Sequence, residues 1–156
     1  MLFRSHFVHL TSEAKHNLQL WLEFLQEHNG KSFLLSSKIT TNRALCLFTD
    51  SSGKIGYGAL FNRSWFNGRW PDSWKEFPVT VLEFYPIVAG VMVWGGDCLA
   101  NHRIEFVTDN EALVSIINNQ TSKNRQVMFL LRKLILHCLK RHNCFTCSWL
   151  KGTQNV

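Results

Sequence analysis

The order in which strand-like and helix-like segments follow one another constrains the fold of this chain more than any other feature. Three short strand-like runs come first, and the turn-like segments SSGK and Asn62-Arg63 separate them, which predicts an antiparallel meander. A helix, a strand, two helices and a last strand follow. Strands interleaved with helices predict an α/β domain in which helices flank one mixed, five-stranded sheet. In chain order, the predicted elements cover residues 44–49, 56–61, 64–70, 80–100, 103–108, 110–119, 125–141 and 144–150.

The first part of the chain shows a helical pattern and no strand-like run. Apolar side chains recur there with the i, i+3, i+4, i+7 spacing of an amphipathic helix, after an N-cap residue at Thr11. These positions are Leu18, Trp21, Leu22 and Leu25. The helix should end near Gly30, and the polar stretch 36–42 then predicts a tether. We therefore expect a helical extension over residues 1–42 and one globular domain over residues 43–156.

Composition limits the class of protein. With 156 residues, of which 46% are hydrophobic, the chain can bury a core of its own. The net charge of +6 and the pI of about 9.3 predict a surface that attracts polyanions such as nucleic acid or anionic lipid. The longest apolar stretch, residues 84–94, is shorter than the roughly 20 residues that cross a bilayer, so we expect no membrane protein. Five cysteines without a secretory leader indicate an intracellular protein of the cytoplasm or nucleus, not a secreted one.

Three acidic residues stand at junctions from which their side chains could meet. Asp50 follows the run 44–49, Asp109 follows the run 104–108, and Glu83 lies early in the predicted apolar helix. Magnesium and manganese prefer carboxylate oxygens, and two such ions about 3.5 to 4 Å apart can activate a water and stabilise a leaving phosphodiester oxygen. If the first and fourth strands are neighbours, the three acids form a metal site suited to that chemistry.

A purely structural explanation of the same acids stays open. Asp50 could belong to a turn, and Asp109 with Asn110 could cap a helix. Glu83 fits this explanation less well, because its neighbours are apolar and glutamate is almost never fully buried unless it is paired or bound to a metal.

Longer strings around these acids carry a family resemblance. LFTDSSGKIGYGALF, TVLEFYPIVAG and FVTDNEALVSIINNQTSKN resemble the three acidic motifs of the ribonuclease H domain attached to retroelement reverse transcriptases. The likeness is closest to the DIRS-type, tyrosine-recombinase retrotransposons. The preceding string LTSEAKHNLQLWLEFLQEHNGKSF resembles the helical connection that follows the polymerase part of those polyproteins, so the resemblance covers residues 6–155.

The resemblance implies a ribonuclease H-like fold and a metal-dependent endonuclease that hydrolyses the RNA strand of an RNA/DNA hybrid. It makes Asp50, Glu83 and Asp109 the catalytic acids that bind two Mg²⁺ or Mn²⁺ ions. It also implies, as a partner, a reverse transcriptase polymerase domain in the same polyprotein.

Departures from the family pattern keep other functions open. Trp149 stands where the family usually has His, and Lys151 stands where it usually has Pro. The fourth acid of the family would lie beyond Val156, so the domain is expected to be truncated at its C-terminus relative to the family. A catalytically impaired module that binds nucleic acid or has a structural role therefore stays open, as does a nuclease that acts on duplex or branched DNA.

Small polar residues and cations near the acids are candidates for contacts with nucleic acid. A hybrid is recognised largely through its phosphates, its 2′-hydroxyls and its minor-groove shape. The candidates are Ser51, Ser52, Asn110, Gln120 and Arg125. The resemblance favours Asn110, and each of the five could instead be an ordinary turn, cap or surface residue.

Two further patterns have simpler explanations. The aromatic residues between positions 65 and 74 could stack on bases, but aromatics that alternate along strands favour a core. His142, Cys144 and Cys147 have a spacing that could suit zinc. Along a strand, however, alternate side chains face opposite ways, which argues against a shared zinc ion.

Overall fold

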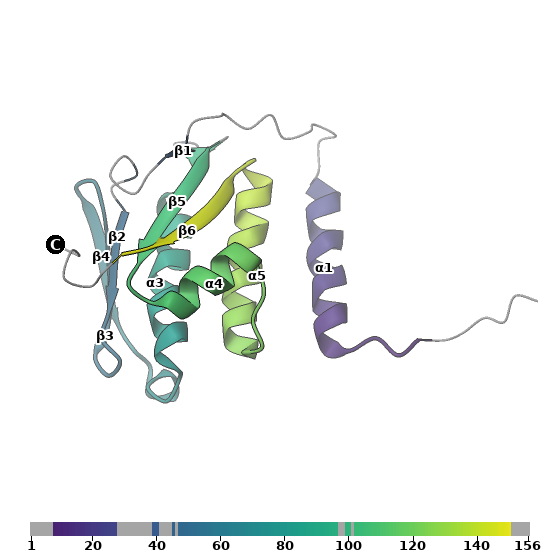
Figure 1. Cartoon of the computed structure of the whole chain (residues 1–156), viewed down its shortest axis with the longest axis horizontal. Coiled ribbons are helices and arrows are strands. Elements are labelled where there is room, and N and C mark those ends of the chain that lie inside the picture. Colours follow the sequence, from purple (N-terminus) through teal and green to yellow (C-terminus); the bar gives the residue numbers. More distant parts are fainter. Residues whose placement is uncertain are drawn as a thin grey trace, which may run out of the picture.

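The computed structural model describes residues 8–27, 39–40, 45, 47–96, 99–100 and 102–150 (Figure 1). Its helices are α1 (Ser12–Glu27), α3 (Val79–Trp94), α4 (Glu111–Asn119) and α5 (Arg125–Lys140), with a short 3-10 helix, η1 (Asp72–Trp74). Its strands are β1 (Ile39–Thr40), β2 (Leu47–Ser51), β3 (Gly56–Phe61), β4 (Ser64–Arg69), β5 (Arg103–Thr108) and β6 (Cys144–Trp149). The predicted α/β class is confirmed. In these residues no helix is long and apolar enough to span a bilayer.

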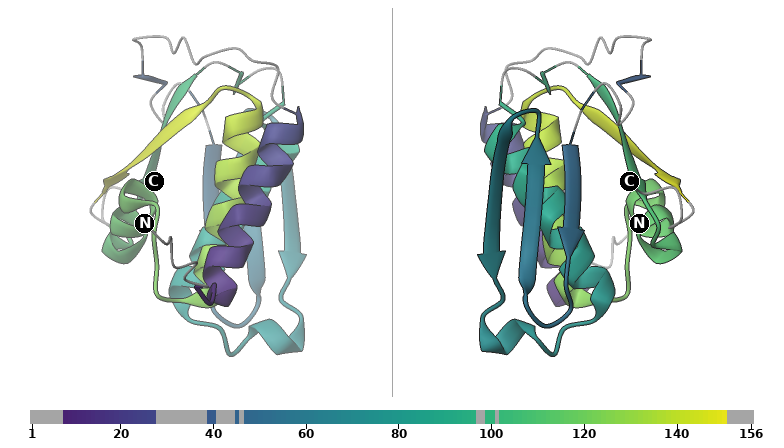
Figure 2. Two further views of the ribbon diagram at one scale, coloured as in Figure 1. Left: turned by 90° about the vertical axis from the view of Figure 1, so that its right-hand side faces the viewer. Right: turned by 90° about the vertical axis from the view of Figure 1, so that its left-hand side faces the viewer.

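Strands β2, β3 and β4 form the predicted antiparallel meander. Asn62 in the β3–β4 turn has a φ of 55°, a left-handed conformation that asparagine tolerates, so Asn62-Arg63 can close a tight hairpin. Gly68 is required on the inner face of β4, because a Cβ atom there would lie 2.5 Å from the ring of Tyr57. Helix α3 packs on this inner face, and the right-hand view of Figure 2 shows the opposite, outer face in front of the helices.

Strands β1, β5 and β6 form a separate parallel sheet, which corrects the prediction of one mixed, five-stranded sheet. Two residues of the predicted tether, Ile39 and Thr40, form β1 and pair with Arg103 and Ile104 at the start of β5. Strand β1 therefore occupies the start of the β5 edge that is not paired with β6. Within the described ranges β2 and β5 are not hydrogen-bonded to each other. The other residues of the tether lie outside the described ranges.

One hydrophobic core joins the two sheets. Leu47 of β2 and Phe106 of β5 belong to it, together with residues of α3, α4 and α5. Helix α3 is strongly apolar on all its faces, which suits its place between the meander and α5. It ends at Trp94, earlier than predicted, because two glycines follow and the Gly95 N–H closes the last turn on the Val91 carbonyl.

Helix α1 lies along α5 as an outer layer (Figures 1 and 2). Polar contacts join the two helices. The Glu13 carboxylate accepts a hydrogen bond from the Arg132 guanidinium, and Lys140 Nζ lies 3.3 Å from Glu23 Oε1. Phe24 adds a buried side chain. Residues 12–27 are therefore packed against α5.

The helix predicted near the N-terminus is confirmed as α1, but its predicted apolar stripe is exposed. The four predicted apolar side chains are half exposed or more, namely Leu18 at 56%, Trp21 at 52%, Leu22 at 51% and Leu25 at 60%. The predicted end near Gly30 and the predicted boundary after residue 42 lie outside the described residues.

Candidate functional site

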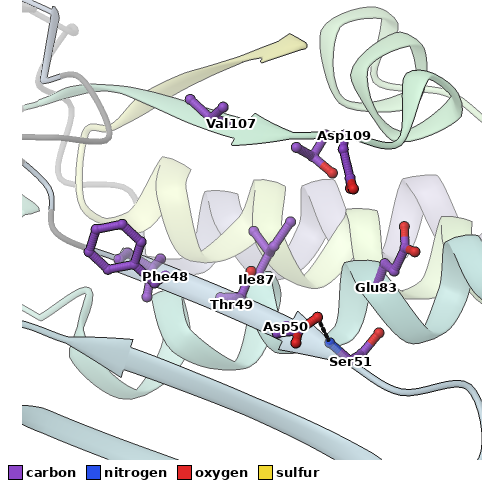
Figure 3. Close-up of a pocket in the computed structure, with 10 residues that line it drawn as sticks. Phe48, Thr49, Asp50, Ser51, Glu83, Ile87, Val107 and Asp109 are labelled. Carbon is purple, nitrogen blue, oxygen red and sulfur yellow. Dashed lines mark hydrogen bonds between the residues drawn. The ribbon is translucent and has the colours of Figure 1, made fainter. Parts of the chain in front are cut away.

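The three acids that were predicted to meet line one cavity of about 140 Å³ (Figure 3). Asp50 comes from β2, Glu83 from the second turn of α3, and Asp109 from the position directly after β5. The C-terminal ends of β2 and β5 thus border the same cavity, although the strands are not paired. Among the described residues that line this cavity there is no lysine, arginine or histidine, so three carboxylates face it without a cationic side chain.

The Asp50 side chain is exposed and turns back toward its own backbone. Its Oδ1 accepts a hydrogen bond of 2.8 Å from the Ser51 N–H, which Figure 3 marks as a dashed line. The following side chain, Ser51, also lines the cavity, and its buried Oγ has no hydrogen-bond partner among the described atoms. One wall of the cavity is therefore polar along β2.

Glu83 is half-buried and is held by Asn110. Glu83 Oε2 accepts a hydrogen bond of 2.7 Å from Asn110 Nδ2. Asn110 Oδ1 in turn accepts a hydrogen bond of 3.2 Å from the Leu113 N–H, as the N-cap of α4. The structural explanation of Asn110 as a helix cap is thus correct, and the same amide also orients one of the acids.

Asp109 is exposed, and its backbone is fixed by Trp149. The indole Nε1 of Trp149 donates a hydrogen bond of 3.2 Å to the Asp109 carbonyl oxygen. This contact follows from the parallel register that places Trp149 opposite Thr108. This contact could not be predicted from the sequence, where Trp149 is visible only as a departure from a family pattern, because it depends on the strand register. In Figure 3 the side chains of Glu83 and Asp109 extend into the cavity from opposite sides.

The donor chemistry of this cavity fits a hard divalent cation, because carboxylate oxygens are the ligands that magnesium and manganese prefer. The acids are not gathered as a ligand set, however. Within the part of the chain that the structure describes, no group of three or more His, Cys, Asp or Glu side chains is arranged to hold a metal ion. Three carboxylates around one cavity repel one another, and two of them are bonded instead to Ser51 and Asn110.

The five candidates for nucleic-acid contacts divide into two groups. Ser51 and Asn110 lie at the acids, and Ser52 borders an adjoining hollow that shares Asp50 with the cavity. Gln120 is the C-cap of α4, at the opposite end of that helix from Asn110, with a left-handed φ of 51°. Arg125 begins α5 and lines a different hollow, beside Trp74 and Phe129. The structure therefore does not bring Gln120 and Arg125 to the acid cavity.

Two cations of α5 contact acidic side chains of α1. Arg132 and Lys140 contact the carboxylates of Glu13 and Glu23, and Lys133 Nζ lies 5.7 Å from the centre of the Phe129 ring. These α5 cations contribute to packing within the chain.

The zinc interpretation is not supported. Cys144 is exposed and Cys147 is buried, so their side chains leave β6 on opposite faces. Burial, with a smaller contribution from Glu105, raises the pKa of the Cys147 thiol to about 11, which disfavours the thiolate that binds zinc.

Most of the aromatic run belongs to the interior, as the alternation indicated. Trp70 is buried and stacks on Trp74 at 5.6 Å, and Phe66 stacks on Trp94 at 4.9 Å between ring centres. Trp65 is the exception, because its side chain is 69% exposed on the outer face of the meander.

No protein-family model matches this chain, and no curated protein matches it. Among solved structures, the chain is similar to the N-terminal RNase H domain of Rv2228c from Mycobacterium tuberculosis, which was solved as a fusion with maltose-binding protein. The similarity covers 70% of this chain and 81% of that one, with 17% sequence identity and a TM-score of 0.47. At these values the likeness alone assigns neither a fold family nor an activity.

Proposed function

We propose that this chain is a ribonuclease H-type endonuclease domain that hydrolyses the RNA strand of RNA/DNA hybrids. The observation that carries the proposal is that Asp50, Glu83 and Asp109, which are distant in the sequence, line one cavity without a cationic neighbour among its described lining. The resemblance of the surrounding strings to three acidic motifs supplies the reaction and the substrate. The net charge of +6 suits a substrate that is a polyanion.

Asp50, Glu83 and Asp109 would hold two Mg²⁺ or Mn²⁺ ions, which when bound supply an activated water and stabilise the leaving 3′-oxygen. The remaining residues position the acids. The Ser51 N–H holds the Asp50 carboxylate, and Asn110 holds Glu83. The Trp149 indole fixes the backbone from which the Asp109 side chain projects. Ser51, Ser52 and Asn110, which lie beside the acids, would contact a bound strand.

We also propose that the domain works beside a reverse transcriptase polymerase domain of the same retroelement polyprotein, inside the cell. The support is the resemblance of residues 10–33 to the helical connection of such polyproteins. The exposed apolar stripe of α1 offers a surface against which a neighbouring domain can pack.

A second function, binding of nucleic acid without turnover, is favoured by two observations. In the described ranges the acids do not form a group that could hold a metal ion. The presence of Trp149 at the position where the family usually has His also favours this second function.

The test is a cleavage assay of RNA/DNA hybrid, duplex DNA and branched DNA with Mg²⁺ and with Mn²⁺. We expect cleavage of the RNA strand of the hybrid, and we expect Asp50→Asn to abolish it. The thermal stability of this variant should be unchanged or higher, because the substitution relieves repulsion among the acids. Glu111→Gln is the matched control, since Glu111 is an exposed acid in the first turn of α4 that does not line the cavity.

Cleavage that Asp50→Asn leaves unchanged would contradict the proposal. Binding of the hybrid that does not depend on magnesium, with no product in Mn²⁺, would support the second function. Preferential cleavage of branched or duplex DNA would keep the acid site and change the substrate.

A further inference from the structure

The outer face of the meander carries a row of exposed apolar side chains. The strand register places Phe48, Leu60 and Trp65 side by side across β2, β3 and β4. Their exposed fractions are 45%, 40% and 69%. Helix α3 packs on the other face, and no element among the described residues packs extensively on this one (Figure 2, right). Two aromatic rings are therefore presented on an open surface.

The same face is hollowed next to this row. One hollow of about 440 Å³ is bordered by Phe48, Leu60 and Trp65. A second hollow of about 550 Å³ adjoins it and extends to Arg69. The two hollows share Gly58, where the absence of a side chain on the middle strand leaves room between the walls. An extended ligand lying along this face would reach from the aromatic row to the end of β4.

The charges around the hollows favour a polyanion as the occupant. Between residues 47 and 69 the chain has three cations, Lys54, Arg63 and Arg69, and one acid, Asp50. Arg69 shares the outer face with Trp65 by strand alternation, and Lys54 and Arg63 are exposed in the two turns of the meander. Exposed aromatic rings combined with cations are the features by which proteins hold single-stranded nucleic acid, since unpaired bases stack and phosphates are attracted. A duplex would offer no free base faces to the rings.

We propose that the outer face of the meander is a binding site for single-stranded nucleic acid, with bases stacked on Trp65 and Phe48 and phosphates near Arg69 and Arg63. This site is separate from the proposed hydrolysis, because stacking requires neither the three acids nor a metal ion. It would hold an unpaired strand beside the acid cavity, which shares Asp50 with both hollows.

To test this proposal, the full chain is titrated in EDTA into short, fluorescently labelled oligo(dT) or oligo(U), and binding is measured by fluorescence anisotropy. We expect both to bind, and we expect Trp65→Ala to weaken binding about five- to hundredfold, the range for loss of one stacking ring. Trp65→Phe, which keeps a ring, should restore most of the affinity. Arg69→Ala should lower the slope of log affinity against log salt by about 1. The DNA and RNA arms show whether the 2′-hydroxyl contributes.

Trp21→Ala is the matched control, because Trp21 is a similarly exposed tryptophan on α1, 52% against 69% for Trp65. Equal affinities for wild type, Trp65→Ala and Trp21→Ala would overturn the proposal. So would a Trp65→Ala variant that loses self-association in sedimentation experiments while oligonucleotide binding is unchanged, since the face would then join two copies of the chain. Because EDTA removes divalent ions, failure of the proposed hydrolysis leaves this result unaffected.

Discussion

At the scale of single residues, Asn110 links the stability of α4 to the position of an acid. Its side-chain oxygen caps the helix, and its side-chain nitrogen donates to Glu83. A helix cap of this kind contributes about 1 kcal/mol to stability. The hydrogen bond to a carboxylate adds a contribution of its own because the acceptor is charged. Loss of this one amide should therefore affect both folding and the site.

We predict that Asn110→Ala lowers the free energy of unfolding by roughly 1 to 3 kcal/mol and also reduces hybrid cleavage. Asn124→Ala is the matched control. Asn124 caps α5 by accepting from the N–H groups of Gln126 and Val127, at 2.9 and 3.0 Å. The control should lose a similar amount of stability in urea unfolding and keep cleavage when assayed well below its unfolding midpoint. Equal cleavage by both variants would show that Asn110 does not position Glu83.

The two cysteines of β6 should differ sharply in reactivity. Cys144 is exposed, whereas burial raises the pKa of the Cys147 thiol to about 11. At about pH 8 roughly 0.1% of such a thiol is ionised, and the thiolate is the reactive form. We predict that iodoacetamide labels Cys144 much faster than Cys147, as measured by peptide mass spectrometry. Similar rates at the two sites would mean that β6 does not present them on opposite faces.

The raised pKa of the Cys147 thiol also predicts how the stability of the fold changes with pH. In the unfolded chain Cys147 ionises near its ordinary pKa of 9.0, while in the folded chain it stays protonated until about 11. Below pH 9.0 the thiol is protonated in both the folded and the unfolded chain. As the pH rises from 9.0 to about 11, the thiol ionises in the unfolded chain first, so the free energy of unfolding decreases. Labelling of Cys147 should therefore increase at high pH together with unfolding.

At the scale of elements, hydrogen bonds and exposed ion pairs join α1 to α5, and the predicted apolar stripe of α1 is exposed. Exposed ion pairs contribute little and are screened by salt. Helix α1 should therefore be the least stably attached helix of the described chain, and its attachment should be sensitive to ionic strength.

We predict that Arg132→Ala accelerates amide hydrogen exchange across α1 and leaves α3 unchanged. Arg132 contacts both Glu13 and Asn17, so this substitution removes two contacts between the helices. Lys133→Ala is the control, since the Lys133 amine lies over the Phe129 ring. High salt should reproduce the effect of Arg132→Ala on the wild type. Unchanged exchange in α1 would indicate that Phe24 and other apolar contacts hold the helix.

Whether a segment is a helix or a strand was easier to predict from the sequence than where the segment ends and which strand it pairs with. The strand and helix patterns around Asn62, Asn110 and Asn124 are local, and the observed elements follow them closely. The early end of α3 follows from its two glycines and could have been predicted. The pairing of β1 with β5 could not, because two residues of a polar stretch carry no local signal for a partner more than sixty residues away.

At the scale of the whole molecule, the candidate site depends on how three separate elements come together. The acids themselves were visible in the sequence, since each stands at a junction or in an apolar context that singles it out. The contacts of Asn110 with Glu83 and of Trp149 with Asp109 were not visible, because they arise from the packing of α3 beside the start of α4 and from the β5–β6 register. The division into two sheets also went unpredicted, since strand pairing is decided over the whole chain.

We propose that Asp50, Glu83 and Asp109 act together on divalent cations. The most direct measurement is a Mn²⁺ titration, by calorimetry and by thermal unfolding, of the wild type, Asp50→Asn, Glu83→Gln, Asp109→Asn and the control Glu111→Gln. Ions that bind the folded chain raise its unfolding temperature. We predict that the wild type and the control bind Mn²⁺ and are stabilised by it, while each of the other three loses most of both effects. Binding that survives in all three variants would contradict the claim.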